Sequence, residues 1–226
     1  MANKGNTRHI QGLAAPWFFS INRKEQTYVL KPNAGRHTLQ RSLPLGLAMK
    51  RLALASTAND AKKILKNGNV RVNGNVIKEL RYPIGLSDTL EIEGAGKSYT
   101  ITINEQGKSV IDEVSKKGES QPYKVVGKYK TKKGVVMVRL HDGRITKAEN
   151  SAKVNDSVLV DANGAIKKVL PLKEGAECFV IDGVHVGKTG KIKSISKGSM
   201  NVTASAVITT KSGEFETIIK NIMIVS

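Results

Sequence analysis

Residues 42–74 read SLPLGLAMKRLALASTANDAKKILKNGNVRVNG, and this stretch predicts two short helices, a strand and a tight turn. Pro44 suits an early position of the first helix. Apolar residues then repeat at helical spacing, at Leu45, Ala48, Met49, Leu52 and Ala55. Thr57 and Asp60 have the spacing of a capping box, so a second helix is expected to begin there and to end at Gly68.

A strand over residues 70–72 is expected after the second helix, because two valines alternate with Arg71 there. Asn73-Gly74 is a dipeptide typical of hairpin turns. Alternation of apolar and polar residues resumes in 88–92 and in 99–103, which predicts a further hairpin.

Basic side chains lie away from the apolar stripes of both helices. Lys62, Lys63 and Lys66 occupy the open side of the second helix, and Arg71 is expected to point outward toward the same side. A run of like charge is usually a solvated face. Here further basic residues flank the run of lysines, so we predict a surface that binds RNA phosphates. The flanking residues are Lys50, Arg51, Lys78 and Arg81.

The whole chain is strongly basic. Its 226 residues hold 37 Lys and Arg against 19 Asp and Glu, which gives a net charge of +18 and favours a polyanionic partner, nucleic acid first. We divide the chain into segments 1–42, 43–104, 105–172 and 173–226, whose net charges are +6, +4, +6 and +2. Positive charge on every segment is typical of a protein embedded among RNA strands.

Several function classes find no support. Cys178 is the only cysteine, which excludes an intramolecular disulfide and a multi-cysteine zinc site and fits a reducing cytoplasm. The apolar residues 13–19 are interrupted by Pro16 and are too few for a signal peptide or a membrane span. No catalytic set, cofactor or small-molecule site is expected, because the histidines are scattered singly, at His9, His37, His141 and His185.

Residues 1–42 combine basic and aromatic side chains without a sustained period. Such a segment can pair with phosphates and stack on bases, which suits an arm that is mobile alone and orders on RNA. The open alternative is that Trp17, Phe18 and Phe19 dock on the next domain. The candidate RNA-binding residues of this arm are Arg8, Arg36, His37 and Arg41.

The segment 105–172 is β-rich. Alternation predicts strands at 135–140 and 158–160, with turns at Asp142-Gly143 and Asn163-Gly164. Residues 154–160 echo residues 86–92, since both place Asp before a strand. Two turn-to-strand starts explain this echo without a true repeat.

The segment 173–226 continues the alternation and predicts a compact five-stranded barrel. The positions expected in its interior are Cys178, Val180, Val184, Val186, Ile192, Ile195, Val202, Val207, Ile218, Ile222 and Ile224.

Residues 183–190, GVHVGKTG, look at first like a P-loop. The first two glycines are one residue too close, and the following residues alternate like a strand instead of forming a helix, so an NTPase is not indicated. The dinucleotide-binding spacing is missed as well. Gly183, Gly187 and Gly190 instead match the KOW pattern, in which a tight loop joins two barrel strands. Lys188 on that loop is a further candidate RNA contact.

The chain resembles a known family over nearly its whole length. Residues 43–93 resemble the S4-type RNA-binding fold, and residues 183–192 resemble KOW. The order of these two parts, after the N-terminal segment 1–42, is similar to their order in the archaeal and eukaryotic small-subunit ribosomal protein S4e family. The motifs that carry the resemblance are His9-Ile10, Ala14-Ala15-Pro16, Pro32-x-x-Gly35-x-His37, Leu43-Pro44-Leu45, Arg81-Tyr82-Pro83-x-Gly85-x-x-Asp88, Val154-Asn155-Asp156 and Asn221-Ile222. Arg36 stands where the family usually has Pro, and the end at Ser226, without a basic extension, favours an archaeal source.

The resemblance implies an α+β, β-rich fold with an S4-type domain of two helices and a small sheet, a central β domain and an SH3-like KOW barrel. It implies a non-catalytic constituent of the cytoplasmic small ribosomal subunit, with small-subunit rRNA and neighbouring ribosomal proteins as partners. Two alternatives stay open. An RNA-modifying enzyme would need a catalytic domain, for which the 68 residues of segment 105–172 are few. A KOW transcription factor would co-purify with polymerase.

Overall fold

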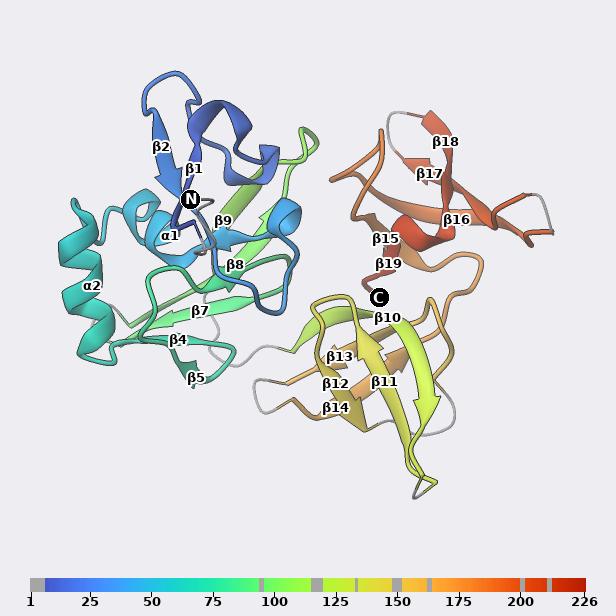
Figure 1. Cartoon of the computed structure of the whole chain (residues 1–226). Coiled ribbons are helices and arrows are strands. Elements are labelled where there is room, and N and C mark those ends of the chain that lie inside the picture. The colour runs from blue at the N-terminus through green and yellow to red at the C-terminus, as the bar shows by residue number, and fades with distance from the viewer. Residues whose placement is uncertain are drawn as a thin grey trace, which may run out of the picture. The chain divides into compact units, whose positions relative to one another are not determined.

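The computed structural model describes residues 7–93, 96–114, 120–132, 134–147, 152–161, 164–199, 202–210 and 213–226. The chain divides into two compact units (Figure 1). The first unit comprises Met1–Thr102 and Lys108–Lys117, and the second comprises Ile103–Gly107 and Gly118–Ser226. Among the described residues, both α-helices lie in the first unit.

The first unit contains a five-stranded sheet in the order β5-β4-β7-β8-β9 and two small sheets, β1-β2 and β3-β6. Its elements are β1 (His9–Gln11), η1 (Gly12–Ala14), η2 (Trp17–Phe19), β2 (Tyr28–Leu30), η3 (Leu39–Arg41), β3 (Leu43–Pro44), α1 (Leu45–Arg51), α2 (Ala58–Lys66), β4 (Val70–Val72), β5 (Asn75–Val76), β6 (Pro83–Ile84), β7 (Thr89–Ile92), β8 (Lys97–Ile103) and β9 (Ser109–Val114), where η denotes a 3-10 turn.

The first predicted helix is present but shorter than its apolar stripe. Pro44 does not open the helix as predicted, because it pairs with Pro83 in the small sheet β3-β6. α1 therefore begins at Leu45, and it ends at Arg51, before Ala53 adopts a positive φ of 54°. The apolar side of α1 faces the core of the unit and is fully buried at Leu45, Ala48 and Met49.

The second predicted helix and the turn after it are confirmed. Thr57 Oγ1 accepts the Asp60 backbone N–H at 3.2 Å, and the Asp60 carboxylate accepts the Thr57 N–H at 3.3 Å, which is a complete capping box. Gly68, with φ of 80°, follows the end of α2. Asn73 and Gly74 both have positive φ, as a hairpin turn between β4 and β5 requires.

Residues 7–41 fold onto this unit instead of forming a separate arm. β1 pairs with β2, and Phe18 and Phe19 are buried. The Ser109 hydroxyl of β9 donates to the Phe18 carbonyl at 2.6 Å. The docking alternative is therefore confirmed for both phenylalanines. The mobility expected for residues 1–42 in the free protein stays a prediction. Trp17, which was expected to dock with them, remains 64% exposed.

The second unit consists of two five-stranded antiparallel sheets, in the orders β12-β11-β10-β13-β14 and β18-β17-β16-β15-β19. We call them the central sheet and the C-terminal sheet. Their elements are β10 (Gln121–Lys130), β11 (Val136–Leu140), β12 (Ile145–Lys147), β13 (Ser157–Val160), β14 (Ile166–Leu170), β15 (Glu177–Val180), β16 (Thr189–Ser196), β17 (Ser205–Thr210), β18 (Gly213–Ile218), η4 (Ile219–Asn221) and β19 (Ile222–Ile224).

The central sheet matches the sequence prediction closely. β11 and β13 coincide with the strands expected at 135–140 and 158–160. Gly143 has φ of 85°, as its predicted turn requires. Gly164 likewise has φ of 80°, whereas Asn163 of the same predicted turn lies outside the described residues.

The C-terminal sheet has the five strands predicted for it, but its interior was only partly predicted. Cys178, Val180, Ile192, Ile222 and Ile224 are buried as expected. Val186 and Ile195 are half-buried. The prediction was wrong for three residues. Val184 is 93% exposed on a loop, and Val202 and Ile218 are exposed as well. On β17 the buried residues are Ala206 and Ile208, and Val207 between them is half-buried.

The two Asp residues predicted to precede strands share one turn geometry. Asp88 accepts the Gly85 N–H at 3.0 Å, and Asp156 accepts the Lys153 N–H at 2.9 Å. Each Asp is buried and follows a non-glycine residue with positive φ. The echo in the sequence is therefore explained by a common turn-to-strand start, as expected.

Lys124 of β10 links the central sheet to the C-terminal sheet within the second unit. Its side chain is buried, and its Nζ donates to the carbonyls of Ile219 at 2.5 Å and Ile222 at 2.6 Å. Burial, together with nearby Lys220, lowers the pKa of Lys124 to about 8.

Candidate nucleic-acid interface

α2 presents its lysines to solvent. Lys62, Lys63 and Lys66 are exposed, while Ala61 and Leu65 of the same helix are buried in the core. The helix is amphipathic, so its charged side is open to a polyanion. We call these three residues the lysine face. The other predicted cations that are exposed are Arg8, Arg41, Lys50 and Lys78.

Arg71 is exposed on β4 as expected, but it has a carboxylate partner. Its Nη2 lies 2.5 Å from Glu93 Oε1, and the two side chains are 44% and 52% exposed. An ion pair so open to water contributes at most about 1 kcal/mol, so a phosphate can displace Glu93. Glu91 lies opposite Arg71 in β7 as well. This strand is therefore less positive than the sequence suggested.

His37 does not lie on the surface. It is buried, and its Nε2 is 2.8 Å from Asp88 Oδ2. Asn73 Nδ2 donates to Asp88 Oδ1 at 2.6 Å, and the Gly85 N–H completes the set. Burial alone would raise the pKa of Asp88, but the hydrogen bonds from His37, Asn73 and Gly85 outweigh it, and the pKa is lowered. We therefore reassign His37 from RNA contact to the core.

Arg51 and Arg81 also have partners within the first unit. Arg51 Nη1 donates to Ser109 Oγ at 2.9 Å, and burial lowers the pKa of its guanidinium. Arg81 donates to the Lys31 carbonyl at 2.8 Å and to the Thr7 carbonyl at 3.2 Å. Both arginines hold segments of the unit together. Arg36 is half-buried, with one guanidinium nitrogen enclosed in protein. RNA contact by Arg51 and Arg81 stays a prediction, made with guanidinium groups that also serve the fold.

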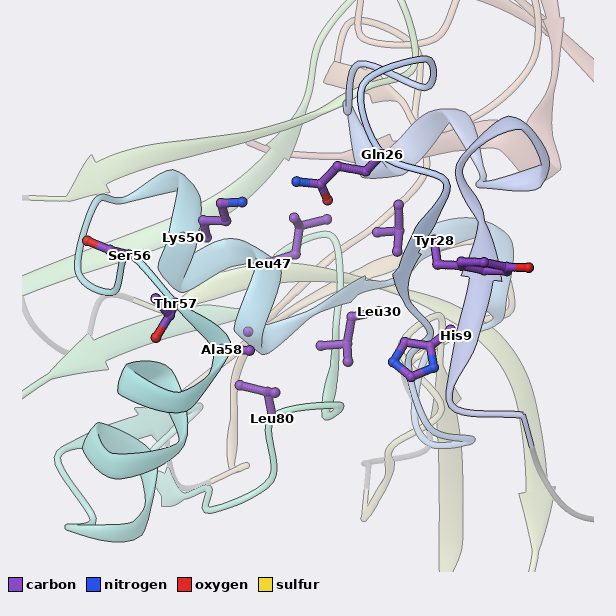
Figure 2. Close-up of a pocket in the computed structure, with 12 residues that line it drawn as sticks. His9, Gln26, Tyr28, Leu30, Leu47, Lys50, Ser56, Thr57, Ala58 and Leu80 are labelled. Carbon is purple, nitrogen blue, oxygen red and sulfur yellow. The ribbon is translucent and has the colours of Figure 1, made fainter.

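A pocket of about 320 Å³ opens beside Lys50 (Figure 2). Leu30, Leu47 and Leu80 form its apolar wall. Figure 2 shows Tyr28, on strand β2, across from the start of α2. The sequence did not indicate this pocket, because its walls come from segments far apart along the chain. The remaining lining residues are His9, Gln26, Val29, Gly46, Ser56, Thr57 and Ala58.

The predicted KOW loop joins β15 to β16. Gly183 and Gly187 have positive φ of 97° and 80°, which favours glycine. Lys188 is half-buried, and its Nζ lies 5.5 Å from the centroid of the Phe215 ring, on which His185 also stacks. Lys188 is thus held against the sheet at the base of the loop.

At Gly190 there is no room for a side chain. A Cβ there would lie 2.6 Å from Ile208 Cγ2 and 2.7 Å from the Thr209 carbonyl oxygen. A Cβ at Gly187 would lie 2.6 Å from the Glu105 backbone nitrogen, in addition to the strain of its positive φ. Valine at Gly190 or at Gly187 is therefore expected to lower the free energy of unfolding of the second unit by about 1–3 kcal/mol, through overpacking at both positions and backbone strain at Gly187. Denaturant titration followed by circular dichroism measures this.

The matched control is Thr189→Val, which places the same side chain at an exposed position of the same strand. It should leave the midpoint nearly unchanged. Wild-type midpoints for both glycine variants would show that the loop does not depend on glycine.

Other chemistry finds little support. The described part of the chain contains no group of three or more His, Cys, Asp or Glu placed to hold a metal ion. It also contains no helix long and apolar enough to cross a membrane. Burial raises the pKa of the Cys178 thiol to about 11, which makes this cysteine a poor nucleophile.

Comparisons with known proteins agree with this organisation. Three family profiles match successive parts of the chain: the RS4NT (NUC023) domain at residues 4–40, the S4 domain at 47–90 and Ribosomal family S4e at 95–165. Small ribosomal subunit protein eS4 of Methanococcus vannielii is 33% identical over 237 residues, which cover 100% of this chain and 96% of that protein. The chain belongs to the S4e family of ribosomal proteins.

Other S4e relatives extend the comparison. The eS4 protein of Aeropyrum pernix is 32% identical over 210 residues, which cover 88% of this chain and 83% of that protein. The crystal structure of the 30S ribosomal protein S4e from Thermoplasma acidophilum superposes with a TM-score of 0.69 at 28% identity, over 82% of this chain and 96% of that one. The predicted α+β, β-rich fold class and the family resemblance are confirmed.

Proposed function

We propose that this chain is a structural constituent of the small ribosomal subunit that binds small-subunit rRNA and lies beside other ribosomal proteins in the cytoplasm, without catalysing a reaction. The lysine face carries the proposal. Three exposed lysines project from a capped helix of an S4 domain, in a chain of net charge +18 that belongs to the S4e family.

The lysine face binds RNA through phosphates. Ammonium groups release counterions from the RNA as they approach, and this supplies affinity without reading sequence. The helix is fixed by its cap and by the buried Ala61 and Leu65, so the three charges are presented in a fixed geometry. Arg71 joins them when a phosphate displaces Glu93.

Similarity over the whole chain favours this function over both alternatives. Relatives named eS4 match along both units, including the part in which an RNA-modifying enzyme would need a catalytic domain. A transcription factor that shared only the KOW loop would not share the S4 domain and the N-terminal segment as well.

Sedimentation tests the proposal. In lysate of the source cells, the protein is expected to follow the small subunit through a sucrose gradient in high salt, because high salt weakens phosphate contacts and strips loosely bound basic proteins, whereas a constituent of the subunit is retained. A peak at the top of every gradient, or co-purification with RNA polymerase instead, would contradict the ribosomal assignment.

A further inference from the structure

Trp17 is the only tryptophan of the chain, and 64% of it is exposed. The next two residues of the turn η2, Phe18 and Phe19, are buried. The Ser109 hydroxyl fixes this turn by donating to the Phe18 carbonyl at 2.6 Å. The indole is thus held outward by a rigid support, an arrangement that the packing of the core does not itself require.

Two cations flank the indole. The Arg23 guanidinium carbon lies 4.3 Å from the centroid of the ring, and Lys108 Nζ lies 5.7 Å from it. Both positions are within the range of cation–π attraction. Arg23 covers one side of the ring, and the exposed fraction shows that much of the remaining indole surface is open.

We propose that Trp17 is a stacking platform for an unpaired RNA base, with Arg23 and Lys108 attracting the phosphates beside that base. This inference rests on the proposed rRNA binding. An aromatic ring among cations is the arrangement that binds single-stranded nucleic acid, because the ring stacks on any base while the cations contact the backbone. The site lies outside the S4 domain and is separate from the lysine face in sequence.

Charge complementarity selects RNA over a protein partner. Leu13, at 70% exposure, supplies an exposed apolar side chain in the same segment, as a protein contact would use. The cations beside Trp17 oppose burial in an apolar protein interface, since each would lose water without gaining an anion. A nucleotide supplies both a base that stacks on the indole and a phosphate that pairs with the cations.

The emission of Trp17 reports the site directly, since no other tryptophan contributes. Saturating unstructured single-stranded RNA, such as a 12-nucleotide uridylate oligomer, is expected to quench the emission of the full-length protein. Inorganic polyphosphate, which has the charge but no bases, should bind with little quenching. Equal responses to the two polymers, or none to RNA, would overturn the platform.

Variants separate stacking from charge. Trp17→Leu is expected to weaken binding of the same oligomer by about 5- to 150-fold, the range measured when one base loses its aromatic partner. Its log–log salt slope should stay unchanged, because no phosphate contact is removed. Trp17→Phe should retain part of the affinity. Tyr129→Leu, an exposed aromatic residue of the second unit, is the matched control and should bind as wild type.

The outcomes distinguish the inference from the function on which it rests. Wild-type affinity in a folded Trp17→Leu variant rejects the platform while rRNA binding stands. A wild-type protein that binds no small-subunit rRNA fragment rejects the proposed function itself. A change in Trp17 emission that requires added ribosomal proteins and not RNA would assign this surface to a protein partner and would also overturn the platform.

Discussion

Replacing Lys62, Lys63 and Lys66 together with glutamine leaves the protein folded but reduces its affinity for small-subunit rRNA fragments by roughly tenfold or more at physiological salt. The three side chains are exposed, and the buried side of α2 is untouched. Each lost phosphate contact should flatten the log–log salt slope by about 0.7–0.9, or roughly 2 to 3 in total. The loss should be similar for all RNA sequences, because phosphate contacts carry no base information.

A second triple variant controls for net charge. Lys97, Lys167 and Lys193 are exposed lysines that each already pair with a carboxylate. Replacing these three with glutamine removes the same formal charge but no predicted RNA contact. Filter binding at several salt concentrations compares the two variants. Equal losses would show that only total charge matters, and an unchanged slope in the lysine-face variant would remove the proposed interface.

Asp88→Asn is expected to lower the free energy of unfolding of the first unit by about 3–5 kcal/mol, the largest stability effect among these variants. The carboxylate is buried and accepts hydrogen bonds from His37, Asn73 and Gly85. The asparagine amide keeps the shape but loses the charge and turns one acceptor into a donor that faces other donors. Circular dichroism follows unfolding in urea.

Glu113→Gln is the matched control, since Glu113 is exposed and pairs only with Lys97 at the surface. It should change the midpoint little. A similar small change for Asp88→Asn would mean that the buried network contributes no more than a surface pair.

The same carboxylate predicts the acid sensitivity of the first unit. The pKa of Asp88 is lowered in the folded protein, so the unfolded chain takes up the proton first, near pH 4. The stability that Asp88 contributes is therefore present above pH 4 and is lost as the pH falls through the folded pKa. Urea midpoints measured from pH 6 downward should fall less steeply for Asp88→Asn than for wild type. Parallel curves would contradict this.

Local signals predicted much of the fold. The capping box at Thr57 and the Asn73-Gly74 turn each depend on neighbours within a few residues, and the structure has both. The glycines of the KOW loop were located for the same reason. The lysine face was predicted equally well, because helical spacing alone separates Lys62 and Lys66 from the buried side of α2.

Partners distant in sequence explain why His37 was misplaced and why the bonds of Arg51 and Arg81 were not foreseen. Charge composition does not distinguish His37, Arg51 and Arg81 from exposed basic residues. Each of the three, however, forms a hydrogen bond to a residue 50 or more positions away. Charge composition contains no signal for such bonds. Strand alternation likewise fixes a period of two without fixing its phase, so Val207 was assigned to the core side of β17, where Ala206 and Ile208 are the buried residues.

Lys124 has a consequence for the order of events during synthesis. β10 leaves the ribosome before η4 and β19, whose carbonyls accept from Lys124 Nζ and whose Ile224 N–H donates to Ser157 Oγ of the central sheet. Until those residues emerge, enclosing the ammonium group would leave a charge without partners. The central sheet therefore keeps this position open to water while the chain is incomplete. We therefore expect the packing of the central sheet to be completed only together with that of the C-terminal sheet.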